Sequence, residues 1–514
     1  MHAGHWVQRS ALRTPNNVLW ISEDRRITYA EGASRINRLS NAILESGGKG
    51  ARVAILCSNR FEGLEAFLAT MSAGCAAVPM NPRLHVQEYQ FLISDSEACI
   101  VIYSEDFAAH VDELKSLVPQ VMLWVCIGSK NCIADTDYED LLLQFPATPP
   151  NVVIDPDDIA WLFYTSGTTG KPKGAMETHR NLVTMCQQFL LGVVPDVSPN
   201  DVMFHVAPIS HGTASCMMPH LAVGAANAFP LSKSFKAEKV FEAIEKYRVT
   251  STFMAPTMIT MLLQSDSHTG YNLSSLKNVI YGGGPMYVNQ LQKSLDVFGN
   301  VFVQIYGQGE APMTVASLPK AAHMVGDDEA KIKRLASCGR EMPGVRIAIL
   351  DDNDTEVGVG EFGEVCVRSD LVMKGYWNRP EATAETLRNG WLHTGDVGYL
   401  DNEGYLFLTD RKKDLIISGG SNIYPREVEE VICSHPAVAE VAVVGVPDDV
   451  WGELVKAVVV LRSGHHLDAA GIIEHCKAHM ASYKKPSVVQ FIDELPKNAT
   501  GKVLKRELRS TACE

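Results

Sequence analysis

The sequence lacks the features that mark exported and membrane-spanning proteins. None of its twelve cysteines forms a C-x-x-C pair, and in a chain of 514 residues scattered cysteines are typical of reduced, mostly buried thiols. The N-terminus MHAGHWVQRS has no apolar core of a secretory signal, and the C-terminus TACE is not a peroxisomal address. The longest apolar runs, such as VMLWVCIG, are far too short to cross a bilayer. These absences predict a protein of the cytoplasm without an integral membrane segment.

The sequence also lacks an excess of positive charge. Lys and Arg number 46 against 60 Asp and Glu, so the net charge is −14 and the pI is near 5.6. This balance argues against nucleic acid or an anionic membrane as the main partner. It does not exclude a local basic site for a phosphorylated ligand.

Short β-rich runs alternate with segments of helical periodicity through most of the chain. RVAILCSN, CIVIYS and VFVQIYG are examples of the first kind, and FKAEKVFEAIEKYRV is an example of the second. This alternation predicts an α/β architecture with largely parallel sheets, in which ligands bind at the strand ends. The length also predicts more than one domain.

The pattern changes twice toward the C-terminus. After about Ser337, Asp, Asn and Gly turns separate short strands, which predicts a smaller β-rich unit. The charged run DRKKD at 410–414 has no apolar anchor, and we place a domain boundary there. The predicted fold is therefore α/β. A large N-terminal domain, residues 1–409, has two α/β subdomains and a small β-rich subdomain, and a small α+β domain, residues 410–514, follows it.

One loop is unusually rich in small and hydroxylic residues. YTSGTTGKPKGA, from Tyr164 to Ala175, follows the apolar run DDIAWLF and carries Lys171 and Lys173 on either side of a proline. Such a stretch is either a surface loop or a phosphate cradle made of backbone N–H groups, hydroxyls and ammonium groups. The loop is not a Walker A motif, because Thr165 and Pro172 stand where that motif needs Gly and Ser or Thr.

Other stretches contain candidate ligand-binding residues that also have plain structural explanations. Asp396 in HTGDVG could accept the hydroxyls of a ribose or could be a turn aspartate. In YGQGE, Tyr306 could stack on a base or lie in the core, and Glu310 could hold Mg²⁺ or be an exposed acid. Lys502 follows a Thr-Gly turn in a basic tail, where a lysine usually has no special role.

Together and in this order, the motifs resemble those of the adenylate-forming (AMP-binding) superfamily, and the GGSNIYP version is most similar to its acyl-CoA synthetases and aryl-CoA ligases. The resemblance covers nearly the whole chain and rests on these segments: YTSGTTGKPKGA, PISHG, YGGGP, YGQGE, GEVCVRSDLVMKGYWNRPEAT, WLHTGD, YLFLTDRKKDLIISGGSNIYP and PKNATGKVLKREL. It implies an ATP-dependent acid–CoA ligase. The acid would attack the α-phosphate of ATP to give an acyl-adenylate and pyrophosphate, and coenzyme A would then displace AMP.

The resemblance also implies the roles of the site residues. Catalytic roles fall to Lys502, which would contact the acid and the α-phosphate, to His211 at the mouth of the acyl pocket, and to Glu310 as the Mg²⁺ ligand, with Thr165 as a possible second ligand. The implied ATP- and AMP-binding residues are Thr165, Ser166, Gly167, Thr168, Thr169, Gly170, Lys171, Lys173, Gly283, Gly284, Tyr306, Gly307, Gln308, Asp396 and Arg411. Lys413 would be the hinge of a mobile C-terminal domain, and Gly419 and Gly420 would face coenzyme A.

One departure from the family pattern concerns the first half-reaction. Gly309 stands where the family usually has a threonine that contacts the α-phosphate, so one hydroxyl is missing. The missing group leaves open whether water, a neighbouring hydroxyl or nothing replaces it.

The segments that form the acyl pocket in this family contain no Lys or Arg. They span 204–218, 253–262, 281–287 and 305–315, and they contain Met217, Met218, Met254, Met258, Met286 and Met313. A second carboxylate on the substrate would be buried without a cation, which is costly. The expected substrate is therefore a monocarboxylic acid with an apolar tail, aliphatic or aryl.

Two other functions stay open. A free-standing adenylating enzyme could load a carrier protein, and a protein that kept the fold could bind nucleotide without catalysis. Retention of Lys502, Asp396 and Glu310 argues against the second alternative. The expected partners are a small carboxylic acid, ATP and coenzyme A, and a homo-oligomer is possible.

Overall fold

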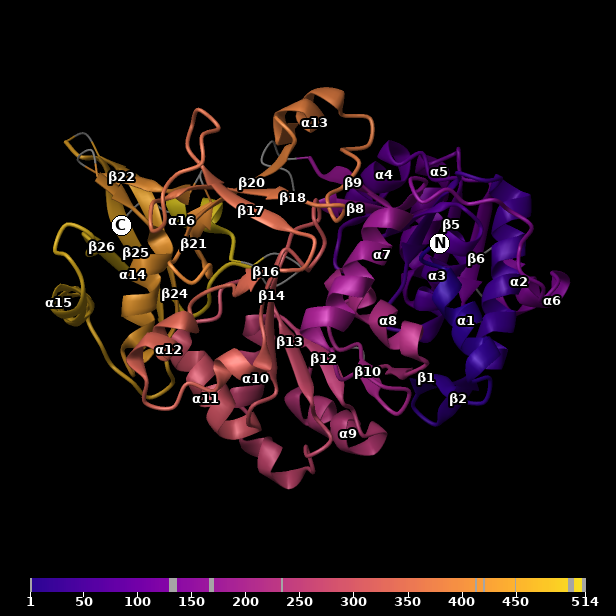
Figure 1. Cartoon of the computed structure of the whole chain (residues 1–514), viewed down its shortest axis with the longest axis horizontal. Coiled ribbons are helices and arrows are strands. Elements are labelled where there is room, and N and C mark those ends of the chain that lie inside the picture. Colours follow the sequence, from indigo (N-terminus) through magenta and orange to yellow (C-terminus); the bar gives the residue numbers. More distant parts are fainter. Residues whose placement is uncertain are drawn as a thin grey trace.

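The structure is a computed structural model. It describes residues 2–128, 136–165, 171–232, 234–411, 414–418, 421–448, 450–497 and 503–510. Within these ranges, none of the helices combines the length and the apolar character that a bilayer-spanning segment needs. The described chain forms a large N-terminal domain and a small C-terminal domain of mixed α/β structure, as the sequence predicts (Figure 1).

The first sheet of the N-terminal domain has seven strands among the described residues, in the order β7-β6-β5-β3-β4-β8-β9. These strands are β3 (Arg52–Leu56), β4 (Ala76–Pro79), β5 (Ile100–Ser104), β6 (Leu123–Ile127), β7 (Thr136–Asp137), β8 (Ile159–Thr165) and β9 (Lys173–Thr178). All neighbours are parallel except β8 and β9, which form an antiparallel hairpin. The hydroxyl-rich motif YTSGTTGKPKGA runs from the end of β8 to the start of β9.

The second sheet has nine described strands, in the order β16-β15-β14-β13-β12-β10-β11-β1-β2. They are β1 (Val18–Ser22), β2 (Arg25–Thr28), β10 (Val202–Phe204), β11 (Ala226–Ala228), β12 (Ser251–Met254), β13 (Asn278–Tyr281), β14 (Phe302–Tyr306), β15 (Ala316–Leu318) and β16 (Arg340–Glu341). The central strands are parallel, and the strands at both edges are antiparallel. Because β1 and β2 precede the first sheet in sequence, the two α/β subdomains are not consecutive segments of the chain.

A five-stranded antiparallel sheet, counted over the described residues, follows. It contains β17 (Arg346–Leu350), β18 (Gly363–Arg368), β19 (Leu387–Arg388), β20 (Trp391–Leu400) and β21 (Leu406–Arg411). This sheet is the β-rich unit that the turn-rich sequence predicts. Its last strand continues to Arg411, and the domain boundary near residue 410 stays a prediction.

The C-terminal domain packs three helices against a sheet of its own. Its described strands are β22 (Ile416–Ser418), β23 (Ser421–Ile423), β24 (Val438–Asp448), β25 (Gly452–Leu461) and β26 (Val488–Phe491), and its described helices are α14 (Pro425–Ser434), α15 (Ala469–His479) and α16 (Lys505–Ser510). Val and Ile side chains of β24, β25 and α14 form a separate core. This arrangement confirms the predicted small α+β domain.

Helices cover the sheets of the N-terminal domain (Figure 1). They are α1 (His5–Arg13), α2 (Tyr29–Gly47), α3 (Phe61–Ser72), α4 (Val86–Asp95), α5 (Ala108–Leu117), α6 (Tyr138–Gln144), α7 (His179–Gln188), α8 (Gly212–Val223), α9 (Ala237–Tyr247), α10 (Pro256–Leu263), α11 (Val288–Phe298), α12 (Glu329–Arg334) and α13 (Pro380–Thr386). Helix α8 is buried along most of its length, from Thr213 to Leu221. A helix that is apolar on every side belongs inside a protein, and α8 lies between the two parallel sheets (Figure 1).

The cysteines depart in one place from the expected pattern. The free cysteines of the described residues are buried, apart from the partly exposed Cys99. Cys126 is disulfide-bonded, so the expectation of reduced thiols is wrong at this position. A disulfide depends on two sulfur atoms meeting in space, which spacing along the sequence does not disclose.

A buried ion pair ties the N-terminal helices together. Glu65 is fully buried and accepts hydrogen bonds from Arg35 Nε at 2.9 Å, Trp20 Nε1 at 3.2 Å and Tyr138 OH at 3.0 Å. The Arg35 guanidinium also binds Glu139. Burial raises the pKa of the Glu65 carboxyl, and Arg35 acts in the opposite direction by favouring its charged form. The negative charge of Glu65 therefore depends on Arg35.

We expect Arg35→Ala to lower the free energy of unfolding by about 3 kcal/mol at pH 8, because it strands a buried carboxylate. The loss should shrink at pH 5. Because burial raises the pKa of Glu65 in the folded protein, a lower pH favours its protonated form, which needs no cation. A carboxyl with a raised folded-state pKa stabilises the fold at low pH, and this contribution is lost as the pH rises through the folded-state pKa. Urea unfolding at the two pH values measures both effects. The double variant Arg35→Met, Glu65→Leu should lose less than Arg35→Ala, and an equal or larger loss would contradict this account.

Candidate active site

The segments that carry the sequence motifs meet at one edge of the nine-stranded sheet. Strands β10, β12, β13 and β14 are parallel neighbours, and the motif PISHG, the predicted pocket segment 253–262, and the motifs YGGGP and YGQGE lie at or just after their carboxyl ends in turn. Open α/β sheets bind ligands at this edge. The structure therefore brings together His211, Gly283 and Tyr306, which lie far apart in the sequence.

Asp396 is held by side chains from the end of β14. The carboxylate is 9% exposed, and its Oδ2 accepts hydrogen bonds from Tyr306 OH at 2.7 Å and from Gln308 Nε2 at 2.5 Å. Gln308 also donates to the carbonyl oxygen of Thr394 at 3.0 Å. Burial, and then the charge of Asp396, raises the pKa of Tyr306 well above its ordinary value, so its hydroxyl stays protonated and donates. The sequence predicts these residues for nucleotide binding, but it does not predict the bonds between them.

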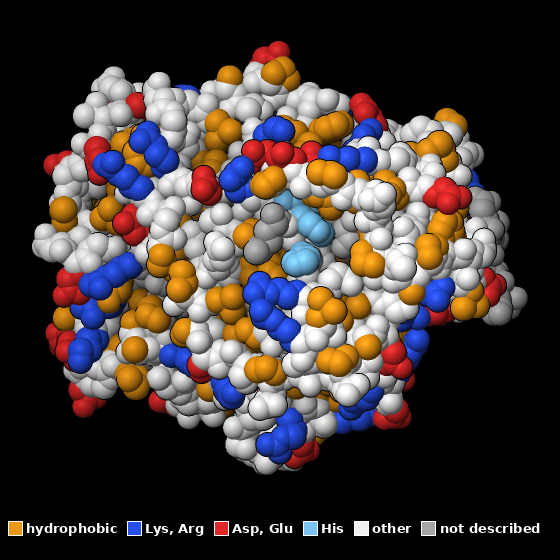
Figure 2. Space-filling view, turned by 45° about the vertical axis from the view of Figure 1, so that its right-hand side comes forward, with side chains coloured by type: hydrophobic (Ala, Val, Ile, Leu, Met, Phe, Trp, Pro, Cys, Tyr) orange, Lys and Arg blue, Asp and Glu red, His pale blue; other side chains and the backbone are white. Residues whose placement is uncertain are grey.

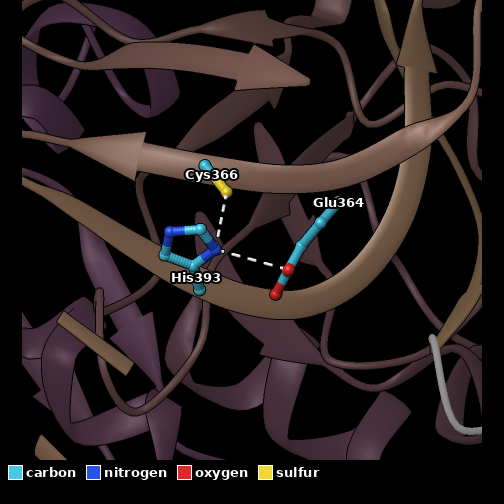
Figure 3. Close-up of side chains that lie close together, drawn as sticks. All are labelled: Glu364, Cys366 and His393. Atoms are coloured by element: carbon cyan, nitrogen blue, oxygen red, sulfur yellow. Dashed lines mark hydrogen bonds and ion pairs between the residues drawn. The ribbon is translucent and has the colours of Figure 1, made fainter. Parts of the chain in front are cut away.

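A second group of side chains fixes the irregular stretch of β20 that carries Asp396, which lies within this strand and not in a turn. Glu364 Oε1 accepts a hydrogen bond from the backbone N–H of Gly395 at 3.0 Å, and its Oε2 lies 3.3 Å from His393 Nδ1. The same imidazole nitrogen lies 3.4 Å from Cys366 Sγ (Figure 3). Gly395 has φ of +70°, a conformation that glycine adopts without strain. Among the described residues, Glu364, Cys366 and His393 are of types that bind metals, and their ligand atoms lie close enough together to bind one ion. Hydrogen bonds, however, account for their arrangement.

Glu310 lies next to the end of the β8–β9 hairpin. Its Oε1 accepts hydrogen bonds from Thr165 Oγ1 at 3.1 Å and from Tyr376 OH at 2.7 Å. Lys173 Nζ lies 5.1 Å from the centre of the Tyr376 ring, so Tyr376 connects the predicted magnesium ligand to a predicted phosphate-binding lysine. A carboxylate beside a hydroxyl is an oxygen set that suits Mg²⁺.

The YGGGP loop leaves room for a ligand. Gly283 has φ of +78°, and a Cβ added to it would meet nothing within 4 Å. A Cβ on Gly284 would be 4.0 Å from Pro256, whereas one on Gly282 would come within 2.5 Å of the carbonyl oxygen of Ile305. Gly282 therefore permits close packing, and Gly283 and Gly284 border open space.

The part of the site around His211 is lined by less polar groups than the part around Asp396 and Glu310. His211 Nδ1 lies 3.0 Å from Ser210 Oγ, and burial lowers the pKa of His211 to about 4, so its imidazole is neutral at pH 7. Behind it, a Cβ on Gly212 would come within 2.8 Å of Met313 Sδ. Met313 has φ of +64°, a conformation that is unusual for a residue with a side chain and often marks a functional site. Met313 and Met258 are partly exposed, whereas the other four methionines predicted for the pocket are buried in the core.

Gly309 creates a close approach between two parts of the site. A Cβ at this position would lie 2.4 Å from Thr165 Cγ2 and 2.5 Å from Phe163 Cδ1. The centre of the Phe163 ring is 6.0 Å from that of His211 in an edge-to-face contact. The side-chain space that Gly309 leaves free is therefore occupied by Thr165 and Phe163. Neither this use of Phe163 nor the role of Tyr376 was predicted from the sequence.

Several predicted site residues lie outside the described ones. They are Ser166, Gly167, Thr168, Thr169 and Gly170 of the loop, the hinge residue Lys413, Gly419 and Gly420, and Lys502. Arg411 is described by its backbone, which pairs with Asp396 across β20 and β21. Lys171 is described, and its Nζ lies 5.8 Å from the centre of the Phe91 ring.

Comparison with known proteins identifies the family. The sequence model of the AMP-binding enzyme matches residues 7–377, and that of the AMP-binding enzyme C-terminal domain matches residues 427–502. The chain belongs to the AMP-binding enzyme family. The sequence-based prediction of an adenylate-forming acid–CoA ligase that uses ATP and coenzyme A is thereby confirmed at the level of the family.

Individual relatives of this AMP-binding enzyme cover almost its whole length. A feruloyl-CoA synthase from Amycolatopsis sp is 37% identical over 509 residues, which are 98% of each chain. A medium/long-chain-fatty-acid–CoA ligase from Mycobacterium tuberculosis is 36% identical over 527 residues, covering 99% of this chain and 90% of the relative. The crystal structure of the anthranilate CoA ligase AuaEII in complex with anthranoyl-AMP matches with a TM-score of 0.90 and 27% identity, over 99% of this chain and 97% of that one.

The crowding around Gly309 leads to a prediction for this AMP-binding enzyme. Gly309→Thr should lower kcat/KM for acid at least tenfold, or about 1.4 kcal/mol, because the new side chain would overlap Phe163 and Thr165. Adding Phe163→Ala should recover part of the loss, since it vacates the overlapped space. Acid-dependent pyrophosphate release measures both variants. A faster reaction with Gly309→Thr alone would instead mean that the missing hydroxyl limits the first half-reaction.

Proposed function

We propose that this acid–CoA ligase acts on a monocarboxylic acid with an apolar tail, aliphatic or aryl. The observation that carries the proposal is the chemistry of the pocket side of the site. Phe163, Met313 and the neutral imidazole of His211 lie there, and the four pocket segments contain no Lys or Arg. A tail with a second carboxylate would lose its hydration without gaining a cation.

In the proposed first half-reaction, the acid attacks the α-phosphate of ATP and pyrophosphate leaves. Lys502 offsets the repulsion between the two anions, and the loop at 165–170 with Lys171 and Lys173 holds the leaving phosphates. Asp396, already fixed by Tyr306 and Gln308, accepts the ribose hydroxyls, with Arg411 beside it. Mg²⁺ bound to Glu310 and Thr165 would supply positive charge next to the phosphates.

In the proposed second half-reaction, the thiol of coenzyme A attacks the acyl carbonyl and AMP leaves. Gly419 and Gly420 face coenzyme A, and a rotation about Lys413 exchanges this face for Lys502. In the structure, residues at the start of helix α11 contact helix α14 of the C-terminal domain. Asn289 Nδ2 donates to the carbonyl oxygen of Cys433 at 2.5 Å, and Tyr287 OH donates to Glu429 at 3.3 Å.

We also propose that the enzyme works in the cytoplasm. Nine cysteines of the described residues are free, against the one disulfide-bonded residue Cys126, and this excess of reduced thiols supports the location, since reduced thiols persist in reducing compartments.

A panel of acids tests the substrate class. Medium-chain and aromatic monocarboxylates should give kcat/KM values at least tenfold above those of acetate and malonate, because the pocket offers apolar contacts and no cation for a second carboxylate. Coenzyme A-dependent AMP formation is the measurement. A dicarboxylate with the highest kcat/KM would disprove the proposed class, and no AMP formation with any acid would disprove the function.

Removal of Lys502 tests the division of the two half-reactions. Lys502→Ala should reduce adenylate formation more than tenfold, because the charge it stabilises develops in that step. Thioester formation from a supplied acyl-adenylate should stay near the wild-type rate. Single-turnover assays of each half-reaction separate the effects, and equal losses in both would exclude the role assigned to Lys502.

A further inference from the structure

Glu177 lies on the strand pair that forms one wall of the site. The register of β8 and β9 pairs Trp161 with Glu177, Phe163 with Ala175, and Thr165 with Lys173. Side chains of directly paired residues point to the same face of a sheet, and so do alternate residues along a strand. Glu177 therefore shares a face with Phe163 and Thr165, which reach Gly309 and Glu310 in the active site.

The carboxyl group of Glu177 has no hydrogen-bond partner. The residue is 1% exposed, and both of its oxygen atoms are buried without a partner, which holds for no other carboxyl group of the described residues. Burial, and then the negative charge of Glu310, raises the pKa of Glu177 well above its ordinary value. Both oxygens can accept a hydrogen bond, the protonated form of a carboxyl group can also donate one, and neither capacity is used within the described chain.

The neighbours of Glu177 on this face are apolar. The Trp161 ring packs edge-to-face against Phe67, with centres 4.9 Å apart, and against Phe163, with centres 5.1 Å apart. A leucine at position 177 would suit these surroundings and would avoid the cost of a buried, unpaired polar group. A buried polar group without a partner calls for an explanation, and pairing with a group of the substrate is one. The molecule that approaches this wall during the proposed reaction is the acid.

We propose that Glu177 is a specificity-determining residue that hydrogen-bonds a neutral hydroxyl or N–H group on the tail of the acid. This inference rests on the proposed function and narrows its substrate class to monocarboxylic acids with one such substituent distant from the carboxylate. The tail reaches Glu177 by displacing the Phe163 ring, which packs against Trp161 and His211 by edge contacts. An acid without the substituent leaves Glu177 unpaired, so the site discriminates against it.

Matched pairs of acids test this assignment. The pairs are 3-phenylpropanoate with 3-(4-hydroxyphenyl)propanoate, and octanoate with 8-hydroxyoctanoate, and the measured quantity is the ratio of kcat/KM within each pair. In at least one pair the wild type should prefer the hydroxylated acid about tenfold or more. Glu177→Leu should bring that ratio to one or below, whereas Glu177→Gln, which keeps a donor and an acceptor, should retain part of it. Met176→Leu, one position away on the opposite face of β9, should leave the ratio unchanged.

The ratio is measured on one folded preparation, so it does not depend on the yield of each variant. The melting temperature gives a second measurement, and Glu177→Leu should raise it because the variant removes an unpaired buried carboxyl. A wild type without preference in either pair, equal losses for both members of the preferred pair, or a lower melting temperature of Glu177→Leu would each overturn the inference. If the wild type forms no AMP with any acid, the proposed function fails as well.

Discussion

The bonds that Asp396 accepts from Tyr306 and Gln308 join two sheets, and the rest of the site depends on this junction. Tyr306 ends a central strand of the nine-stranded sheet, and Asp396 lies on β20 of the antiparallel sheet. Glu364 on the neighbouring strand β18 accepts a hydrogen bond from the backbone N–H of Gly395, just before Asp396, and contacts His393 (Figure 3). In the proposed function Asp396 accepts the hydroxyls of a ribose, and a carboxylate that is fixed before ligand binds would lose little entropy on doing so.

The site concentrates dehydrated acids in a protein that already has a net charge of −14. Glu310 is held by two hydroxyl donors, and burial, followed by the charge of Glu310, raises the pKa of Glu177. Fixed cations are therefore needed wherever phosphates bind. In the view of Figure 2, Lys and Arg side chains lie close to histidine side chains near the middle of the surface shown. An overall acidic protein can thus handle anionic substrates, because short-range charges decide binding at the site.

Sequence motifs were sufficient to predict the family, the fold class with its large and small domains, and the strand ends at which the motif segments meet. They could do so because parallel strands place their carboxyl ends at one edge, so His211, Gly283 and Tyr306 had to converge. They could not reveal Phe163 filling the space beside Gly309, Tyr376 bridging to Glu310, or the unpaired carboxyl of Glu177. Those contacts arise from packing between segments that no motif connects. The alternation of β9 places Glu177 beside the site only once its register with β8 is known.

The central claim is that the carboxylate of the acid attacks the α-phosphate of ATP. Transfer of oxygen from the acid tests it directly, with an apolar monocarboxylate labelled with ¹⁸O at both carboxylate oxygens and with ATP and coenzyme A unlabelled. The account predicts that AMP gains one ¹⁸O per turnover and that pyrophosphate gains none. Label in inorganic phosphate or pyrophosphate, with unlabelled AMP, would contradict attack at the α-phosphate.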